Sequence, residues 1–370
     1  YQNSTYERLD QFTFTSGSLY AEHDPAVDPT LLNKSVRGGR FFASGGTTGK
    51  PKHVFYSNED FDHLCAALAE NFLKAGVKRG MKVANLFAAG SLYSSFLAVD
   101  KYCEKMDVNQ LPIGGLAKAE EIVQLLAHHK PEAIFGLPSL IVQYAQHAET
   151  NQVKLSIPMV FYAGENISEG AKTYLREFWG TKHFHSAGYA SVDAGVIGFQ
   201  CAHADHGVHH VIAPHVHLEI VDEEAVVTSF LRSGMPVVRY RTGDKIVWVE
   251  GTCGCGDLAP RFKLLGRLDS QINIWACRVP LTDIEAALKL TFGEVPDYQV
   301  IIQSQGASEK LRVCLHRPAP QLAEKLFRVC ADLNKTITLQ HLQQGLSVET
   351  TTHFEQNPRT GKIPKLLDKR

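Results

Sequence analysis

Strand–helix–strand alternation between residues 81 and 190 limits the fold of this chain more than any other feature. Short apolar runs, which we expect to be strands, alternate there with segments whose apolar residues recur at helical spacing. The expected strands are 81–87, 133–135, 158–163 and 183–187, and the expected helices are 118–130, 138–149 and 168–179. Because parallel strands need crossover connections, this alternation predicts a mainly parallel sheet with helices on its faces.

After residue 208 the pattern changes to an alternation of apolar and polar residues, which is typical of antiparallel strands. Residues 211–249 therefore predict a β-barrel-like subdomain beside the parallel sheet. Further on, the expected helices are 283–290 and 320–333, and the expected strands are 299–303 and 311–316. We predict a large α/β N-terminal domain, residues 1–266, and a small α+β C-terminal domain, residues 267–370.

Composition excludes several classes of protein. Among 370 residues, 38 Lys+Arg face 39 Asp+Glu, so the chain lacks the positive charge with which nucleic-acid binders neutralise phosphates. No apolar run approaches the roughly 20 residues of a membrane helix, and residues 1–10 lack the apolar core of a signal peptide. Eight cysteines are too few for a disulfide scaffold. These features predict a cytoplasmic protein with neither nucleic-acid nor membrane partners.

The segment Ser44-Gly45-Gly46-Thr47-Thr48-Gly49-Lys50-Pro51-Lys52 is suited to a polyphosphate. Its glycines let backbone N–H groups approach a ligand, and its hydroxyl and ammonium groups add donors and positive charge. It is not a Walker A loop, because its glycines are too closely spaced and a proline follows the first lysine. A flexible surface turn is the alternative explanation.

Three further motifs carry polar residues on short loops. Tyr240-Arg241-Thr242-Gly243-Asp244 places an aspartate where it can accept two ribose hydroxyls, or act in a simple turn. Gly266-Arg267-Leu268-Asp269 stands at the predicted domain boundary. Asn357-Pro358-Arg359-Thr360-Gly361-Lys362 holds a lysine on a Pro/Gly-shaped loop, for which a solvated basic tail is the alternative.

In set and order these four motifs resemble the AMP-forming adenylate-forming superfamily of acyl-CoA synthetases, peptide-synthetase adenylation domains and luciferases. The resemblance runs from about Phe41 to Pro364. The phenylacetate–CoA ligase-like subgroup is the most similar, through the segments Tyr162-Ala163-Gly164-Glu165, Cys201…Gly207-Val208-His209 and Cys253-Gly254-Cys255-Gly256. This resemblance implies an AMP-forming acid ligase of the acid–thiol type, which uses ATP to activate a carboxylic acid as an acyl-AMP and releases pyrophosphate.

The resemblance also implies roles for individual residues. The expected catalytic residues are Lys362, which reaches the α-phosphate, Thr47, which contacts the β- and γ-phosphates, and Asp193, which replaces the usual Mg²⁺-binding glutamate. Asp269 is the expected hinge of the C-terminal domain. The expected ATP-binding residues are Ser44, Gly45, Gly46, Thr48, Gly49, Lys52, Gly164, Glu165, Tyr189 (stacked on the adenine), Asp244 (on the ribose) and Arg267.

We expect the acid to bind beyond the carboxyl ends of the parallel strands, as ligands do in open α/β sheets. Aromatic residues at these ends predict an aromatic-lined slot and favour an aryl or fused-ring acid, for example a phenazine-type acid in antibiotic biosynthesis. The expected acid-binding residues are Phe135, Gly136, Tyr162, Ala163, His185, Ser186 and Gly188.

A structural zinc site is a further hypothesis. Six of the 17 histidines fall between His203 and His217, with Cys201 before them and Cys253 and Cys255 after them. Cysteine and histidine in a set of four are typical ligands of structural Zn²⁺. The predicted ligands are Cys201, His209, Cys253 and Cys255, and the resemblance to metal-binding members of the phenylacetate-type group supports them. A reduced cysteine pair with surface histidines is the alternative.

The acceptor of the acyl group is less constrained by the resemblance. Ala276 stands where the family has a glycine that leaves room for pantetheine, and Asn273 replaces a common lysine. Few residues precede Ser44, so a partner chain, as in a homodimer, could complete the acid pocket. The expected acceptor is CoA or a carrier-protein thiol. The alternatives are a reductase or an amine that takes the acyl-AMP, and a non-catalytic nucleotide- or acid-binding relative that acts with partner enzymes.

Overall fold

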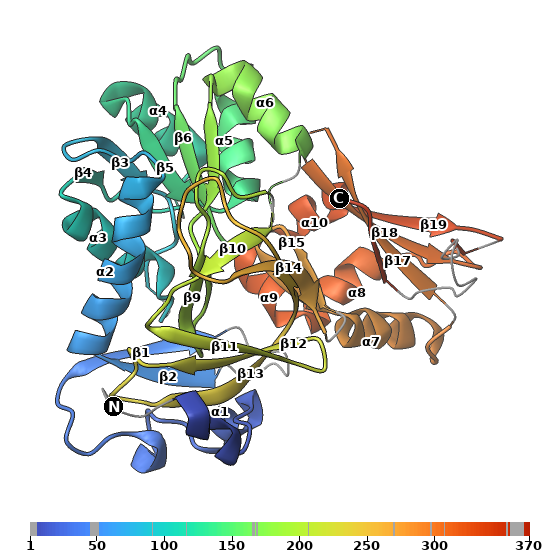
Figure 1. Ribbon diagram of the computed structural model, residues 1–370. Helices are drawn as coiled ribbons and strands as arrows, with labels where there is room; N and C mark the ends of the chain where they lie inside the picture. The colour runs from blue at the N-terminus through green and yellow to red at the C-terminus, as the bar shows by residue number, and fades with distance from the viewer. Residues whose placement is uncertain are drawn as a thin grey trace. The chain divides into compact units, whose positions relative to one another are not determined.

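The computed structural model describes residues 6–44, 52–90, 92–115, 117–164, 167, 169–205, 207–268, 271–296, 298–306, 308–352, 354–355 and 366–370. The chain divides into two compact units (Figure 1). The first comprises residues 1–136, 147–163 and 179–269, and the second comprises residues 137–146, 164–178 and 270–370. The domain boundary between residues 266 and 267 stays a prediction.

A parallel sheet of five strands, in the order β4-β3-β5-β6-β7, lies in the first unit. Its strands are β3 (Lys82–Asn85), β4 (Asn109–Leu111), β5 (Ala133–Gly136), β6 (Met159–Tyr162) and β7 (His183–Ser186). The helices of this part of the chain are α2 (Asn58–Lys74), α3 (Ser95–Met106), α4 (Ala119–His129), α5 (Pro138–Thr150) and α6 (Glu169–Trp179). Every neighbouring strand pair is parallel, which confirms the predicted sheet.

The continuous apolar runs of this sheet are explained by burial. All residues of β5 and β6 are buried, as expected for parallel strands covered on both faces. Phe72 of α2 packs edge-on against Phe135 and Phe161, at ring-centroid distances of 5.1 and 5.2 Å. Helix α2 therefore covers one face of the sheet, and it begins at Ser57, whose side chain accepts a hydrogen bond from the backbone N–H of Asp60.

The antiparallel region forms a second sheet in the first unit, in the order β11-β12-β13-β14-β10-β9-β8. Its strands are β8 (Tyr189–Ser191), β9 (Gly195–Phe199), β10 (Val208–Val211), β11 (Val216–Val221), β12 (Glu224–Ser229), β13 (Val237–Val249) and β14 (Arg261–Arg267). Every pair is antiparallel, as predicted. Because β11 and β8 are its edges, this sheet is open and does not close on itself.

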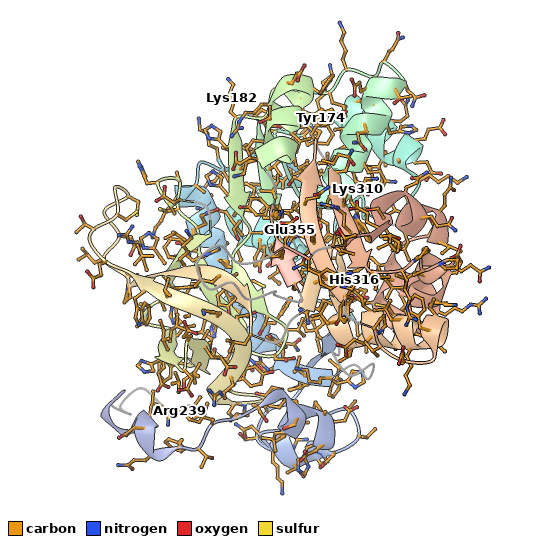
Figure 2. The ribbon with its side chains drawn as sticks, turned by 90° about the vertical axis from the view of Figure 1, so that its right-hand side faces the viewer. Tyr174, Lys182, Arg239, Lys310, His316 and Glu355 are labelled. Carbon is orange, nitrogen blue, oxygen red and sulfur yellow. The ribbon has the colours of Figure 1, made fainter. Side chains whose placement is uncertain are left out.

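A hairpin of β1 (Gly39–Ser44) and β2 (Lys52–Ser57) carries the glycine-rich motif, since Ser44 pairs with Lys52 and the motif connects the two strands. The N-terminal segment contains η1 (Tyr6–Gln11), α1 (Gly17–Glu22) and η2 (Pro29–Leu31). Arg239 of β13, labelled in Figure 2, donates hydrogen bonds to the backbone oxygens of Asp10 and Phe12 in this segment.

The second unit contains a four-stranded sheet in the order β19-β18-β17-β20, and a hairpin of β15 and β16. Its strands are β15 (Gln271–Ile274), β16 (Cys277–Pro280), β17 (Tyr298–Gln305), β18 (Ser308–Leu315), β19 (Leu346–Thr350) and β20 (Leu366–Asp368). Its C-terminal helices are α7 (Leu281–Phe292), α8 (Leu322–Val329), α9 (Ala331–Thr336) and α10 (Leu339–Gly345). The single helix predicted at 320–333 is two helices, because Cys330 has extended backbone dihedrals (φ −88°, ψ 102°).

The mixed α/β and α+β fold class is therefore as the sequence predicts. Among the helices within the described ranges, none combines the length and the apolar character needed to cross a membrane.

Candidate functional site

Lys52, Asp193 and Tyr240 meet although they come from three distant segments. Lys52 begins β2, Asp193 lies in the turn between β8 and β9, and Tyr240 lies in β13. The Lys52 ammonium forms an ion pair with Oδ2 of Asp193, and the Tyr240 hydroxyl donates to the same oxygen at 2.5 Å. The last lysine of the glycine-rich motif thus lies against the carboxylate predicted to hold Mg²⁺.

The other carboxylate oxygen of Asp193 fits a magnesium ligand. Asp193 Oδ1 is buried and has no hydrogen-bond partner among the described residues. An unsatisfied buried oxygen is costly, and Mg²⁺ in proteins is usually held by one or two carboxylates together with phosphate oxygens. The guanidinium of Arg232 donates to the Asp193 backbone oxygen at 3.3 Å and adds positive charge to this cluster.

Tyr189 and Asp244, predicted to bind the adenine and the ribose, are in direct contact. The Tyr189 hydroxyl donates to Oδ2 of Asp244 at 2.7 Å. The Asp244 backbone N–H donates to Thr242 Oγ1 at 3.1 Å, and the Tyr189 ring lies edge-on to Phe262 at 5.5 Å. Arg267 pairs with Asp244 in the β13–β14 ladder, but its side chain is outside the described part of the structure.

Part of the predicted acid-binding edge also assembles. Strand register places Gly136, Tyr162 and Ser186 side by side at the carboxyl ends of β5, β6 and β7. The Ala163 N–H donates to Gly136 O at 3.4 Å, and the Ala187 N–H donates to Tyr162 O at 2.7 Å, which extends the edge beyond the strand ends. Gly188, at φ +111°, follows in a conformation that favours glycine.

Phe135 and His185 do not belong to this edge, which corrects the predicted aromatic slot. In register with Phe161, they form a stacked row with centroid distances of 4.7 and 5.5 Å on the face covered by α2. Phe135 is fully buried there, and burial lowers the pKa of His185 to about 4. Because successive strand residues point to opposite faces, neither side chain can share a slot with Tyr162.

Several predicted residues lie outside the described part of the chain, and their roles stay predictions. They are Gly45, Gly46, Thr47, Thr48, Gly49, Glu165, Asp269 and Lys362, together with the side chain of Ser44. Gly164 is described and has φ +81°.

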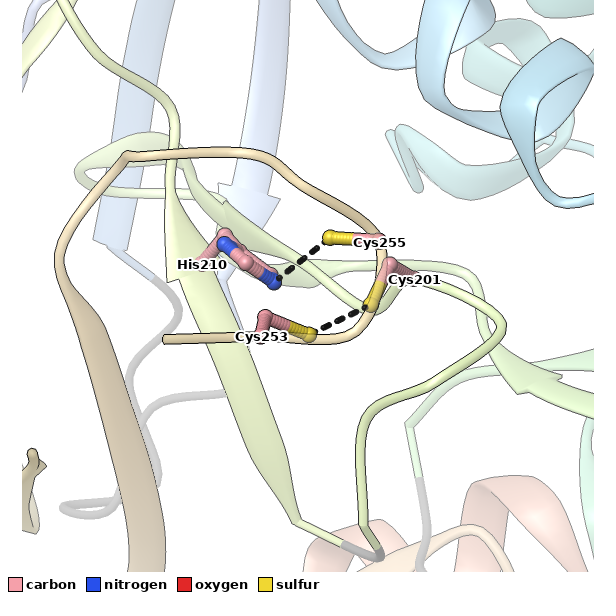
Figure 3. Close-up of side chains that lie close together, drawn as sticks. All are labelled: Cys201, His210, Cys253 and Cys255. Carbon is pink, nitrogen blue, oxygen red and sulfur yellow. Dashed lines mark hydrogen bonds between the residues drawn. The ribbon is translucent and has the colours of Figure 1, made fainter. Parts of the chain in front are cut away.

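A separate cluster of three cysteines and one histidine lies in the antiparallel region (Figure 3). Cys201 follows β9, His210 belongs to β10, and Cys253 and Cys255 lie between β13 and β14. Their ligand atoms all lie within 4.8 Å of one another. The Cys201 and Cys253 sulfurs are 3.5 Å apart, and the Cys255 sulfur is 3.6 Å from Nε2 of His210.

The Cys201–Cys253 and Cys255–His210 distances are those of ligands around a tetrahedral metal ion, and the two sulfurs are too far apart for a disulfide. A disulfide requires about 2 Å between sulfurs, whereas ligands at the usual zinc distances lie about 3.3–3.8 Å apart around a tetrahedral ion. The backbone N–H of Cys255 lowers the pKa of the Cys253 thiol, whereas burial raises the pKa of the Cys201 thiol to about 12. The metal-binding thiolate is therefore favoured at Cys253 and disfavoured at Cys201 without an ion. The donor set is that of a structural zinc site.

His210, and not His209, is the histidine of the cluster, which corrects the predicted ligand set. The two are neighbours on β10, so their side chains point to opposite faces. His209 stacks on Phe262 at 5.7 Å, and its Nε2 lies 3.2 Å from Ser186 Oγ.

Comparisons with known proteins show which proteins the chain is similar to. No protein-family model matches the chain. A phenylacetate–coenzyme A ligase of Thermus thermophilus is 26% identical and aligns with 98% of this chain and 88% of its own length. The crystal structure of a 2-hydroxyisobutyryl-CoA ligase bound to 2-HIB-AMP and CoA has the same fold, with a TM-score of 0.68, 18% identity and coverage of 96% of this chain and 80% of that chain.

The predicted resemblance to the AMP-forming adenylate-forming superfamily is confirmed by these phenylacetate–coenzyme A ligase relatives. An indoleacetate–lysine synthetase of Pseudomonas savastanoi is a further relative, 22% identical over 81% of this chain and 76% of its own length. The predicted class of enzyme, an AMP-forming acid ligase of the acid–thiol type, is confirmed by the ligase relatives.

Three residues of the described clusters were not predicted from the sequence, namely Tyr240, Arg232 and His210. Tyr240 is the first residue of the Tyr-Arg-Thr-Gly-Asp motif. It lies an even number of residues from Asp244 on β13, and strand alternation could therefore have suggested Tyr240 as a site residue. Arg232 lies outside the four motifs, in the turn before β13, so the sequence gives no sign that its guanidinium contacts the backbone of Asp193. His210 was obscured by the adjacent His209.

Proposed function

We propose that the protein activates a carboxylic acid as an acyl-AMP with release of pyrophosphate, and then transfers the acyl group to a thiol such as CoA. The ion pair of Lys52 with Asp193 carries this proposal, because it joins the phosphate-binding motif to the proposed magnesium carboxylate. The CoA ligases among its relatives support the same reaction.

The residues at the site suit this chemistry. When a carboxylate attacks the α-phosphorus of ATP, negative charge develops on phosphoryl oxygens, and the protein contributes mainly positioning and cations. Lys52 and Arg232 supply positive charge around Asp193, while Tyr189 and Asp244 hold the nucleoside. Magnesium held by Asp193 would neutralise charge on the pyrophosphate.

Lys362 is the proposed contact to the α-phosphate. Lys362→Ala should abolish adenylation while sparing ATP binding, because the lysine is needed only where the transition-state charge develops. Isotope exchange between pyrophosphate and ATP measures the first effect, and equilibrium dialysis of ATP measures the second. Exchange at the wild-type rate in this variant would refute the role.

An aromatic acid is the proposed substrate. The name phenylacetate, shared by several relatives, supports it, and Tyr162 remains at the acid edge after Phe135 and His185 are removed from the slot. A role in secondary metabolism such as antibiotic biosynthesis, with an aryl or phenazine-type acid, is the finer form of this proposal. The acid panel should include 2-hydroxyisobutyrate as a small branched comparison.

An amine is the second candidate acceptor, and two observations favour it. One relative is an indoleacetate–lysine synthetase. In the turn between β15 and β16, Trp275 and Ala276 both have positive φ, +53° and +63°, a conformation that favours glycine. Ala276 adds a methyl group there, at the position where the resemblance places the glycine that leaves room for pantetheine. Mass spectrometry of reactions containing CoA or lysine would distinguish a thioester from an amide. If the true acceptor is a carrier-protein thiol or a reductase, both reactions should contain acyl-AMP and AMP, with neither a thioester nor an amide.

We also propose a structural zinc ion at Cys201, His210, Cys253 and Cys255. All four ligands come from the protein, which leaves no open position for catalysis. The ion would tie the β13–β14 connection to β9 and β10. Elemental analysis of the purified protein tests this, and less than about half an equivalent of zinc would contradict it.

A further inference from the structure

Two residues of the antiparallel sheet region, Gln200 and His209, hold Ser186, whose hydroxyl also accepts from the backbone N–H of Gly188 at 3.2 Å. The Ser186 backbone N–H donates to Oε1 of Gln200 at 2.8 Å, and its hydroxyl lies 3.2 Å from Nε2 of His209. Gln200 is itself fixed, because its amide nitrogen donates to Asp205 O at 3.1 Å. Since Ser186 ends β7 beside Tyr162, Gln200 and His209 hold the acid edge from the side of the antiparallel sheet.

The orientation of the His209 ring is determined by its contacts. Nδ1 lies 3.1 Å from the carbonyl oxygen of Gly207, which can only accept, so Nδ1 carries a hydrogen and donates. Nε2 of the neutral ring is then an acceptor, and the hydroxyl of Ser186 donates to it. The ring is buried and stacked on Phe262 at 5.7 Å, which restricts its rotation.

His209 also contacts the proposed nucleotide residues. Its ring centroid lies 6.3 Å from that of Tyr189, whose hydroxyl donates to Asp244. The same imidazole therefore touches Ser186, at the acid edge, and Tyr189, at the adenine. An acyl-adenylate joins an acid to AMP, so this imidazole contacts one residue proposed for each half of that intermediate.

We propose that His209 is a positioning residue that holds Ser186 and Tyr189 in the geometry for the acyl-adenylate. This inference rests on the proposed adenylation function and assigns His209 a role distinct from metal binding. His210 faces the cysteine cluster from the other side of β10, so the strand is fixed on both faces (Figure 3). Small displacements of reacting groups are costly, which gives such an indirect contact a measurable effect.

The experiment uses four variants of the full chain: His209→Ala, His209→Gln, Ser186→Ala and the control Thr181→Val. Thr181 precedes β7 at the opposite end of the strand, where its buried hydroxyl donates to Ile157 O at 2.8 Å. This control loses a comparable hydrogen bond away from the site. Acid-dependent pyrophosphate exchange gives KM and kcat, and calorimetric titration with AMP gives nucleotide affinity without turnover.

We expect His209→Ala to raise the KM for the acid at least about tenfold and to weaken AMP binding severalfold. His209→Gln should recover part of both losses, because its amide oxygen can accept from Ser186. Ser186→Ala should reproduce the effect on the acid KM but bind AMP normally, since His209 still contacts Tyr189. Thr181→Val should match the wild type in both measurements.

The two proposals fail in different ways. If the wild type neither binds AMP nor exchanges pyrophosphate with any acid, the adenylation function fails and this inference fails with it. If the wild type does both, but His209→Ala and His209→Gln keep the KM and AMP affinity of Thr181→Val, only the positioning role is overturned. The positioning role would also be overturned if His209→Ala loses activity only in proportion to the fraction of protein that is unfolded, while its KM for the acid is unchanged.

Discussion

The parallel and the antiparallel sheet of the first unit differ in where they place polar side chains. In the parallel sheet, β5 and β6 are wholly buried and apolar. In the antiparallel sheet, β13 carries a row of paired polar residues, such as Arg239 with Glu219 at 2.9 Å and Arg241 with Glu224 at 2.6 Å. The parallel sheet therefore contributes a buried support and the proposed acid edge, while the antiparallel sheet and its turns carry Asp193, Tyr240 and Asp244.

The largest expected effect comes from the turn of the antiparallel sheet that holds Asp193. Asp193→Asn keeps the shape of the side chain but removes its charge, so pyrophosphate exchange should fall at least about 100-fold, or about 3 kcal/mol. The control is Asp62→Asn, whose partly exposed ion pair with Lys105 is remote from the cluster. Equal exchange rates in the two variants would contradict the role of Asp193.

A smaller effect is expected at the nucleoside contact. Asp244→Asn weakens the charged acceptor of the Tyr189 hydroxyl and of the proposed ribose, so the KM for ATP should rise about tenfold. The KM for the acid should change little. The matched control is Asp222→Asn, because Asp222 is an exposed partner of Arg241. Steady-state kinetics at varied ATP measure the effect, and an unchanged KM for ATP in Asp244→Asn would contradict the assignment.

The cysteine cluster should affect metal content and stability more than chemistry. Cys253→Ser and His210→Ala should each lose zinc and lower the melting temperature by several degrees, because a structural metal contributes to folding. His209→Ala and Cys314→Ser, a buried cysteine outside the cluster, should keep their zinc. Loss of zinc in His209→Ala but not in His210→Ala would restore the ligand set expected from the sequence.

The smallest effect on activity is expected in the parallel sheet. His185 has a pKa of about 4 in the folded protein, below the ordinary value near 6.5. The unfolded chain therefore takes up a proton between pH 6.5 and 4, and the wild type loses about 2–3 kcal/mol of stability by pH 4.5.

His185→Phe removes this loss, so its urea-unfolding free energy should change less between pH 7 and pH 4.5 than that of the wild type. Its exchange activity should stay within about twofold, because the side chain stacks on Phe161 away from the acid edge. An equal pH dependence in both proteins, or a large loss of exchange, would contradict this placement.

The contrast between the sheets also explains what the sequence could predict. The buried strands were predictable because their apolar runs and helical connections follow simple periodicities. The order of the motifs predicted Lys52, Asp193, Tyr189 and Asp244 as site residues. In the structure Lys52 contacts Asp193, and Tyr189 contacts Asp244.

Strand orientation was the harder part. His209 and His210 have the same chemistry, and only the pairing of β10 with β9 and β14 determines which face each occupies. Phe135 was assigned to the slot for the same reason, since an apolar strand gives no sign of which face is the core. Tyr240 and Arg232 reach Asp193 only through tertiary contacts.

Acid-dependent ATP–pyrophosphate exchange by the wild-type protein is the direct measurement of whether it forms an acyl-AMP from a carboxylic acid and ATP. It should be measured across aryl, fused-ring and small branched acids, each with and without CoA. We expect exchange with at least one aromatic acid in the absence of CoA, because adenylation precedes acyl transfer. No exchange with any acid, while the protein still binds ATP, would contradict it and favour a nucleotide-binding relative without catalysis.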